Sequence, residues 1–386
     1  MVLFIPQDNF DQIDEHEETV ETPDVSEPEK KHRRRLKRWD WWESIGSPKY
    51  VTAPMVDQSE LAFRMMTRHY GAGLTYTPMI NSKVFAICKT YRKENFNTAP
   101  GDDPLIAQFC GDNPELLIES ARYIQHQVSA LDINFGCPQG IARKGHYGSH
   151  LLNEPDLCAS LASAMVANLE CPVTVKIRLV NLNDPGFQDT INLISQFEAA
   201  GVDMLCIHPR TKEMKKDLTG EAIWDAARLV KGRFRNFPII CNGGISSFED
   251  IFKCLDFTGC DAVMSSEAIL EKPDLFCPTS KKSQDELAKE YLGFVREYPM
   301  VSKWANRCVK SHMFRFLYAG LQRHTDLRAQ MAMSKTLDQV EAVIDELAVR
   351  RRAEPIGLFS DLGWYDRHRN PIGKKEADGP SVAQAE

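Results

Sequence analysis

The stretch Ala130-Leu131-Asp132-Ile133-Asn134-Phe135-Gly136-Cys137-Pro138 shows the pattern from which the fold of this chain can be inferred. It is a short apolar run that ends in a turn built from glycine and proline, which is typical of a buried β-strand. A cysteine lies at the tip of this turn, whereas structural cysteines are commonly found inside apolar runs. On these residues alone, a reactive thiol and a strained structural turn are supported equally.

Seven further runs of this kind lie along the chain, and amphipathic stretches separate most of them. The strand candidates are 50–53, 74–76, 105–108, 130–134, 173–177, 204–208, 239–242 and 262–265, and the helix candidates are 60–70, 114–127, 155–168, 187–200, 223–231 and 248–255. Apolar strands that alternate with helices predict a parallel sheet covered on both faces. Eight such units favour a closed barrel over a doubly wound open sheet, whose Gly-x-Gly-x-x-Gly fingerprint is absent after the first strand.

The strand pattern stops near residue 285, and helical periodicity continues to about residue 350. We therefore expect an α/β protein, with a (β/α)8 TIM barrel over 45–284 followed by a small all-helical domain over 285–355. Residues 281–352 contain 14 Lys and Arg against 9 Asp and Glu. This local excess of positive charge suits a nucleic-acid phosphate backbone, and a solvated helical face is the alternative interpretation.

The two ends of the chain have the composition of disordered tails. Residues 1–29 are acidic and lack Lys and Arg, and the basic run from Lys30 to Arg38 follows at once. We assign 1–44 to a disordered acidic and basic tail, and 356–386 to a polar C-terminal tail. The basic run has three open interpretations: a nuclear address, an arm that contacts RNA, or a solvated run neutralised by the acidic block.

The overall composition excludes several classes of protein. No apolar run reaches the roughly 18 residues of a membrane span, and the amino terminus lacks the pattern of a signal peptide. The 11 cysteines contain no Cys-x-x-Cys pair, so we expect free thiols, no metal site and a reducing compartment. We expect a cytoplasmic protein, with a nuclear location also open because of the basic run. A monomer is the favoured state.

Unusual residues gather where the predicted strands end, which is where TIM barrels hold their chemistry. Each of them has a structural explanation when taken singly, but together they predict a ligand-binding rim. In chain order they are Pro54, Met55, Val56, Gln108, Asn134, Cys137, Lys176, Arg178, His208, Arg210, Asn242, Gly243, Gly244, Ser266 and Glu267. The loops after the last two strands of such barrels commonly bind phosphate through exposed backbone N–H groups. With Lys176 able to stabilise negative charge on a ring, the pattern suggests flavin mononucleotide (FMN).

Seven motifs, in order and spacing over residues 48–280, resemble those of the tRNA-dihydrouridine synthases. They are Ala53-Pro54-Met55, Gln108-Phe109-Cys110-Gly111, Asn134-Phe135-Gly136-Cys137-Pro138, Arg143-Lys144-Gly145, Val175-Lys176-Ile177-Arg178, His208-Pro209-Arg210-Thr211 and Asn242-Gly243-Gly244-Ile245. Three further segments, 54–59, 91–95 and 145–148, resemble the eukaryotic branch of this family, which acts on D-loop positions 16 and 17.

The resemblance implies an FMN-dependent reduction of uridine to 5,6-dihydrouridine in tRNA, with NADPH or NADH as the reductant. It implies that hydride passes from reduced FMN to C6 of the uracil and that Cys137 donates a proton to C5. Asn134, Arg178 and Arg210 are implied on the substrate side, and the helical domain is implied to hold the tRNA. The residues implied to contact FMN are Pro54, Met55, Val56, Gln108, Lys176, His208, Asn242, Gly243, Gly244, Ser266 and Glu267.

Two departures from the family pattern stand out. Ala268 occupies a position where the family often has glycine, and Gly244 occupies one where many relatives have Asn or Asp. Neither change removes a chemical group that the reaction needs. Two alternatives stay open: an FMN-dependent reductase of a free pyrimidine, and a tRNA-binding chaperone without catalysis.

Overall fold

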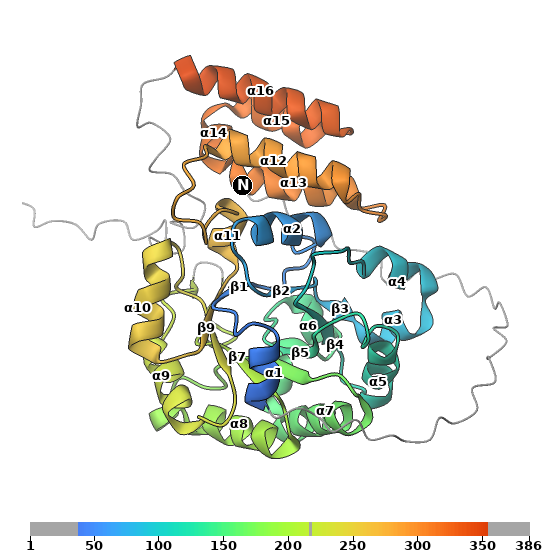
Figure 1. The fold of residues 1–386 in the computed structure, drawn as a ribbon, viewed down its shortest axis with the longest axis vertical. Helices are drawn as coiled ribbons and strands as arrows, with labels where there is room; N and C mark the ends of the chain where they lie inside the picture. The colour runs from blue at the N-terminus through green and yellow to red at the C-terminus, as the bar shows by residue number, and fades with distance from the viewer. Residues whose placement is uncertain (1–37, 216–217, 354–386) are drawn as a thin grey trace, which may run out of the picture. The chain divides into compact units, whose positions relative to one another are not determined.

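A computed structural model describes residues 38–215 and 218–353, which all belong to one compact unit of the chain. Its centre is a ring of parallel strands in the order β1-β9-β8-β7-β6-β5-β4-β2, and a bridge between Val51 and Leu74 joins the two ends (Figure 1). The predicted TIM barrel is therefore confirmed. Its strands are β1 (Tyr50–Thr52), β2 (Thr75–Tyr76), β4 (Leu105–Cys110), β5 (Ala130–Phe135), β6 (Val173–Arg178), β7 (Met204–His208), β8 (Ile239–Asn242) and β9 (Ala262–Ser265).

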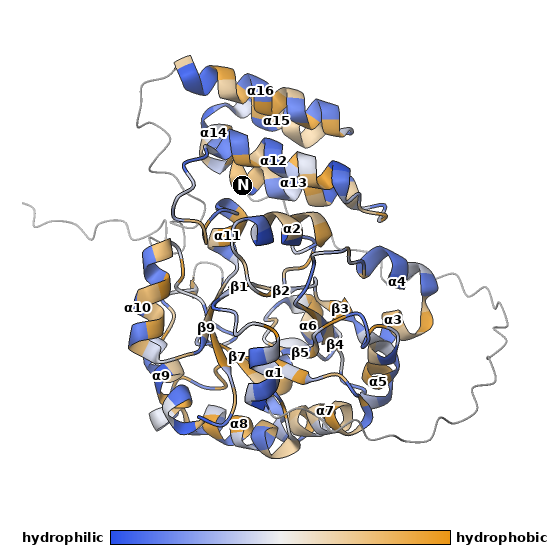
Figure 2. Cartoon of the chain, in the orientation of Figure 1, coloured by the Kyte–Doolittle hydropathy of each residue, from blue (hydrophilic) through white to orange (hydrophobic). Residues whose placement is uncertain are grey.

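The helices predicted between the strands are all present and cover the outside of the barrel. They are α2 (Leu61–His69), α5 (Pro114–Arg122), α7 (Pro155–Asn168), α8 (Gln188–Ala200), α9 (Trp224–Arg233) and α10 (Phe248–Thr258). Figure 2 shows hydrophobic and hydrophilic residues alternating along them, as expected for helices with one buried face.

Several short elements were not predicted from the sequence. They are β3 (Ile80–Asn81), α3 (Ser82–Ile87), α4 (Lys89–Asn95), α6 (Gly140–Lys144) and the 3-10 helices η1 (Gly148–Asn153) and η2 (Pro185–Phe187), whereas the helix start expected after Ser266 is present as α11 (Glu267–Glu271). Each is too short for a clear hydrophobic period, and side chains help to start two of them. Asn81 Oδ1 accepts a hydrogen bond from the Val84 N–H at 3.2 Å to begin α3, and Cys88 caps α4 in the same way.

The predicted boundary of the N-terminal tail at residue 44 is wrong over residues 38–44, which form helix α1 (Arg38–Ser44). Trp41 and Trp42 of α1 are buried among residues of the barrel interior such as Met204 and Ile106. The Trp41 indole N–H donates to the carbonyl of Ser129, just before β5, so α1 covers the amino end of the barrel. The remainder of the predicted tails, 1–37 and 354–386, lies outside the described residues.

Within the part of the chain that the structure describes, five helices follow the barrel, and we call residues 284–353 the helical module. They are α12 (Gln284–Glu297), α13 (Ala305–Phe316), α14 (Tyr318–Arg323), α15 (Thr325–Met333) and α16 (Leu337–Ala353). Phe63 of α2 stacks on His312 and Phe316 of α13, with ring centroids 4.6 and 6.4 Å apart. One hydrophobic core therefore runs from the barrel into the helical module. Among the described residues, no helix is long and apolar enough to cross a membrane.

Candidate active site at the barrel rim

The loop that follows β5 holds Cys137 through backbone hydrogen bonds. The side-chain oxygen of Asn134 accepts from the N–H groups of Gly136 and Cys137, at 3.1 and 2.8 Å. The Ser149 N–H and hydroxyl both donate to the Cys137 carbonyl at 3.0 Å. Gly148 has a φ of +70°, and a Cβ there would lie 2.7 Å from the Cys137 carbonyl oxygen. Only glycine fits this close approach, so the backbone beside the thiol is tightly fixed.

The surroundings of Cys137 favour the protonated thiol. Its side chain is half-buried and packs with the apolar group formed by Cys110, Ala142 and Tyr147. Burial raises the pKa of the Cys137 thiol, and this effect outweighs the opposite influence of the Gln139 backbone and of nearby cations. A thiol with a raised pKa is a poor nucleophile at neutral pH but can donate a proton.

Two cations of β6, Lys176 and Arg178, lie close enough to Cys137 to influence its pKa. Lys176 Nζ donates to Asn242 Oδ1 at 2.8 Å, and burial lowers the pKa of Lys176. Arg178 Nε donates to the Gly136 carbonyl at 2.9 Å, while Nη1 donates to the carbonyl of Thr211 at 2.8 Å. Burial, with a contribution from Arg210, lowers the pKa of Arg178 to about 10. Arg178 thus fixes the residue next to Cys137, a role that the sequence did not predict for it.

His208 and Arg210 form a pair at the end of β7. Arg210 Nη1 lies 3.0 Å from His208 Nε2, and Arg210 Nε and Nη2 donate to the carbonyl of Gly220. Burial and the neighbouring cations lower the pKa of His208 well below its usual value. Because a guanidinium can only donate, Nε2 is the acceptor and Nδ1 carries the proton of a neutral imidazole.

The turn after β8 keeps its backbone exposed by using two glycines. Gly243 and Gly244 have φ values of +109° and +79°. A Cβ on Gly243 would lie 2.9 Å from Nη1 of Arg210, and one on Gly244 would lie 2.9 Å from Nε1 of Trp224. Side chains are therefore excluded here, which leaves a backbone cradle of the kind that binds phosphate.

The anion position at the start of α10 is already filled by the protein. Asp250 Oδ2 accepts from the N–H groups of Ser246 and Ser247, each at 3.1 Å. A phosphate at this part of the rim would consequently meet Gly243 and Gly244, together with Ser266 and Glu267 where α11 begins. The phosphate contacts predicted at these residues stay a prediction, and they would place the site off the N-terminus of α10.

Gln108 differs from its predicted position because β4 continues to Cys110. It lies two residues before the end of the strand and is fully buried. Its amide donates to Asp132 Oδ2 and accepts from the Asn134 amide, both at 2.8 Å. Thr174 also donates to Asp132, at 2.6 Å, and burial raises the Asp132 pKa to about 6. Gln108 therefore orients Asn134, and through it the backbone of Cys137.

Sequence reasoning missed the functional position of Asp132. A carboxylate inside an otherwise apolar strand was the available signal, because such a group needs hydrogen-bond partners when it is buried.

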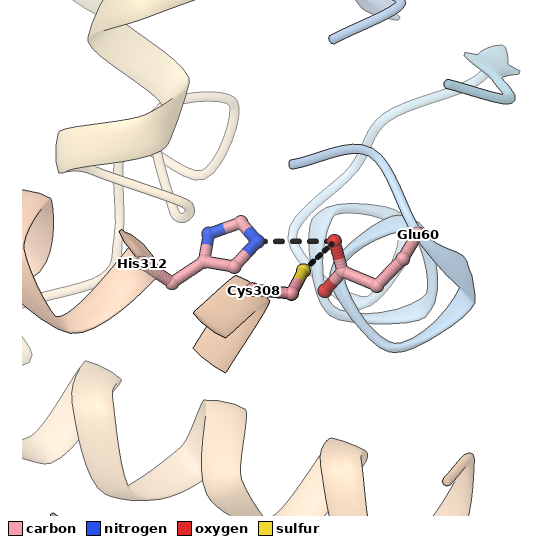
Figure 3. A group of neighbouring side chains, drawn as sticks. All are labelled: Glu60, Cys308 and His312. Atoms are coloured by element: carbon pink, nitrogen blue, oxygen red, sulfur yellow. Dashed lines mark hydrogen bonds and ion pairs between the residues drawn. The ribbon is translucent and has the colours of Figure 1, made fainter. Parts of the chain in front are cut away.

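The loop after β1 carries Pro54, Met55 and Val56, and its end is anchored to the helical module. Val56 is 52% exposed at the tip of this loop. The carboxylate of Glu60 accepts from His312 Nε2 at 3.1 Å and from the Cys308 thiol at 3.5 Å (Figure 3), and from the Tyr291 hydroxyl at 2.7 Å. We call these four residues the Glu60 cluster. Burial opposes the ionisation of Glu60, but the charge and hydrogen bond of His312 outweigh it, so the Glu60 pKa is lowered.

Three members of this cluster are of kinds that bind metal ions. The ligand atoms of Glu60, Cys308 and His312 all lie within 4.8 Å of one another. However, Nδ1 of His312 is buried without a partner, whereas a metal-bound histidine normally donates its second N–H to an acceptor. Hydrogen bonding to one carboxylate accounts for the arrangement. The sequence did not reveal it because Glu60 lies about 250 positions from its partners.

Comparison with known proteins adds information that the geometry alone does not give. The sequence model of the family described as "Dihydrouridine synthase (Dus)" matches residues 51–354. A Mus musculus protein named tRNA-dihydrouridine(16/17) synthase (NAD(P)(+))-like is 39% identical over 319 residues, which are 82% of this chain and 65% of that protein. The chain thus spans just under two thirds of this relative.

Two fungal proteins with the name tRNA-dihydrouridine(16/17) synthase (NAD(P)(+)) are also similar to this chain. The one from Saccharomyces cerevisiae is 38% identical and the alignment covers 75% of this chain and 70% of that protein. The one from Schizosaccharomyces pombe is 36% identical, with coverage of 83% and 82%.

Proposed function

This chain belongs to the dihydrouridine synthase family, and we propose that it reduces uridine to 5,6-dihydrouridine in the D-loop of tRNA, at positions 16 and 17. The observation that carries the proposal is Cys137, a half-buried thiol whose backbone is fixed by Asn134 and Ser149 on a rim that also presents Lys176 and Arg178. Burial raises the pKa of this thiol, which suits a proton donor. The names of the relatives that cover most of the chain support the same substrate and positions.

We propose FMN as the resident cofactor and NADPH, or NADH, as the reductant. The rim fits such a group, because it offers a backbone cradle at Gly243 and Gly244 and a buried cation at Lys176. Pro54, Met55, Val56, His208, Asn242, Ser266 and Glu267 would complete the contacts. When bound, FMN would supply the hydride that adds to C6 of the uracil.

In this proposal Cys137 protonates C5 of the uracil. Adding hydride to a conjugated ring builds negative charge that must be stabilised and then neutralised by a proton. Asn134 fixes the backbone of Cys137 directly, and Arg178 fixes the adjacent Gly136, while the buried Lys176 faces the same rim. Gln108 and Asp132 act one step further away, because they orient Asn134.

The tRNA would approach the rim from the side of the helical module. A uridine must leave its stack to reach a pocket at the mouth of a barrel. Residues 298–325 contain five Lys and Arg and no Asp or Glu, which suits contact with phosphates. These five positive residues equal the whole excess of Lys and Arg over Asp and Glu in residues 281–352.

The test is flavin reoxidation without oxygen. The purified, FMN-loaded protein is reduced with NADPH, and unmodified tRNA is then added while the flavin absorbance and dihydrouridine are followed. We expect rapid reoxidation with tRNA and none with free uridine or orotate. Cys137→Ala should lower product formation by about 100-fold or more, as expected when a general acid is lost, while Cys277→Ala serves as the matched cysteine control.

Each alternative predicts a different result in this experiment. Reoxidation by a free pyrimidine but not by tRNA would identify a reductase of small pyrimidines. A protein that binds tRNA, yet holds no flavin even after FMN is added, would be a non-catalytic chaperone. Product formation at an unchanged rate in Cys137→Ala would contradict the role of the thiol.

A further inference from the structure

Three large apolar side chains are exposed where the helical module meets the loop after β1. Trp304 is 53% exposed just before α13, Val301 is 72% exposed three residues earlier in the chain, and Val56 is 52% exposed at the tip of the loop. Nothing in the fold of the described residues requires an exposed tryptophan at this point. Large exposed apolar side chains that gather in one place commonly mark a binding surface.

The contacts of α13 place Trp304 toward the rim. Along one face of α13, His312 and Cys308 contact Glu60 (Figure 3). On the same helix, Ser311 accepts from Gln58 at 2.8 Å, and Cys308 also contacts the Asp57 carbonyl. Residues nearer the start of α13 therefore contact earlier residues of the loop after β1, from residue 60 back to residue 57.

Trp304 continues this face by one turn, since it precedes Arg307 and Cys308 by three and four residues. Arg307 already reaches the Asp57 carboxylate at 3.8 Å. The next residues along the loop in this direction are Val56 and Met55, which belong to the proposed cofactor loop. Trp304 is therefore directed to the part of the module that borders the mouth of the barrel.

Two cations lie close to the Trp304 ring, and one of them, Arg307, also pairs with the Asp57 carboxylate. Lys303 Nζ lies 5.4 Å from the centroid of the Trp304 ring, and the guanidinium carbon of Arg307 lies 5.9 Å from it. Within the described part of the chain, no carboxylate pairs with Lys303. The acidic residues of the helical module are used elsewhere, as in the pairs of Glu341 with Arg296 and Asp326 with Arg350.

We propose that Val56, Val301, Lys303, Trp304 and Arg307 form a nucleotide-stacking site, the Trp304 patch, for a base that flanks the target uridine in single-stranded RNA. An aromatic face accepts any base by stacking, and neighbouring cations bind the phosphates on either side. Such a site would hold the strand while the uridine turns into the barrel. This inference rests on the proposed function, which it deepens by assigning a substrate-positioning site.

The experiment uses the full-length, FMN-loaded protein with three substitutions. Trp304→Ala removes the ring, Trp304→Phe keeps an aromatic face, and Phe252→Ala removes another exposed aromatic, 49% exposed on α10, as the control. For each protein we would measure tRNA affinity, kcat/KM for dihydrouridine formation, and the rate of flavin reduction by NADPH without tRNA. Thermal melting monitors the fold.

We expect Trp304→Ala to lower tRNA affinity and kcat/KM by about 5- to 100-fold, the usual loss when one stacked base loses its aromatic partner. Trp304→Phe should recover most of this loss, and Phe252→Ala should match the wild type. Flavin reduction by NADPH should stay within about twofold in all three variants. Lys303→Ala should also weaken tRNA binding and reduce its salt dependence.

Two results would overturn the inference. In one, Trp304→Ala binds and reduces tRNA like Phe252→Ala. In the other, its defect lies in flavin reduction by NADPH, so that the patch serves the reductant. If the wild type binds tRNA but forms no dihydrouridine, the proposed function fails, and the loss of affinity in Trp304→Ala still decides whether the patch binds RNA.

Discussion

At the scale of single residues, the chemistry of this protein depends on the state of one thiol. Cys137 is close to several cations, which by themselves would favour the thiolate. Burial has the larger effect and keeps its pKa raised. On a more exposed and more positively charged rim, a cysteine would form the thiolate and act as a nucleophile. The burial of Cys137 therefore favours proton donation instead.

This balance predicts the pH dependence of the reaction. Proton donation requires the protonated thiol. Because the pKa of Cys137 is raised, the thiol loses its proton only above the ordinary cysteine pKa of about 8.5. Single-turnover formation of dihydrouridine with saturating tRNA should therefore be level between about pH 6.5 and 8.5 and fall only at higher pH. A decrease that begins near pH 7 would mean that the thiolate forms too readily for this role.

At the scale of elements, the loop after β1 joins the rim to the helical module. Its tip carries residues of the proposed cofactor site, and its end is held by the Glu60 cluster (Figure 3). Three donors from α12 and α13 meet one buried carboxylate. Removing that carboxylate would leave the Tyr291 hydroxyl and His312 Nε2 without this acceptor, which is costly in a buried position, whereas the Cys308 thiol would keep the Asp57 carbonyl.

We predict that Glu60→Ala destabilises the protein by about 3–5 kcal/mol and weakens FMN retention. Glu341→Ala is the matched control, because its exposed ion pair with Arg296 should contribute less than about 1 kcal/mol. Denaturant unfolding and flavin release would measure the two effects. Equal stability of the two variants would show that the cluster does not anchor the loop.

The lowered pKa of Glu60 also predicts in which direction the stability of the protein changes with pH. A carboxyl group with a lowered pKa in the folded state stabilises the protein above its unfolded pKa of about 4.3, and this contribution is lost as the pH falls through the folded value. The difference in stability between the wild type and Glu60→Ala should accordingly shrink in acid.

At the scale of the whole molecule, the barrel and the helical module share one hydrophobic core among the described residues. Phe63 of α2, together with Tyr291 and Phe316 of the module, forms the centre of their contact. A boundary between independent domains normally has few such contacts. We therefore expect barrel and module to unfold together.

Phe316→Ala tests this expectation, since it removes a fully buried ring and should cost about 3–5 kcal/mol. Far-ultraviolet circular dichroism reports mainly on helices, and flavin release reports on the barrel. Both midpoints should shift to lower denaturant by the same amount and stay coincident. A first transition that melts helices while the flavin stays bound would show two separate units.

The sequence by itself determined the barrel, its eight main strands and the rim residues that line their ends, because alternating apolar strands and amphipathic helices have few ways to bury their faces. Short elements such as α1 and β3 could not be predicted from the sequence, because so few residues show no hydrophobic periodicity. The tertiary structure alone decided the partners of each polar group. Gln108 faces Asp132 and Asn134, Arg178 fixes Gly136, and Glu60 meets His312, all through contacts between residues far apart in the chain. Hydrogen bonds and burial depend on distance in space, and for these groups only the closed fold sets that distance.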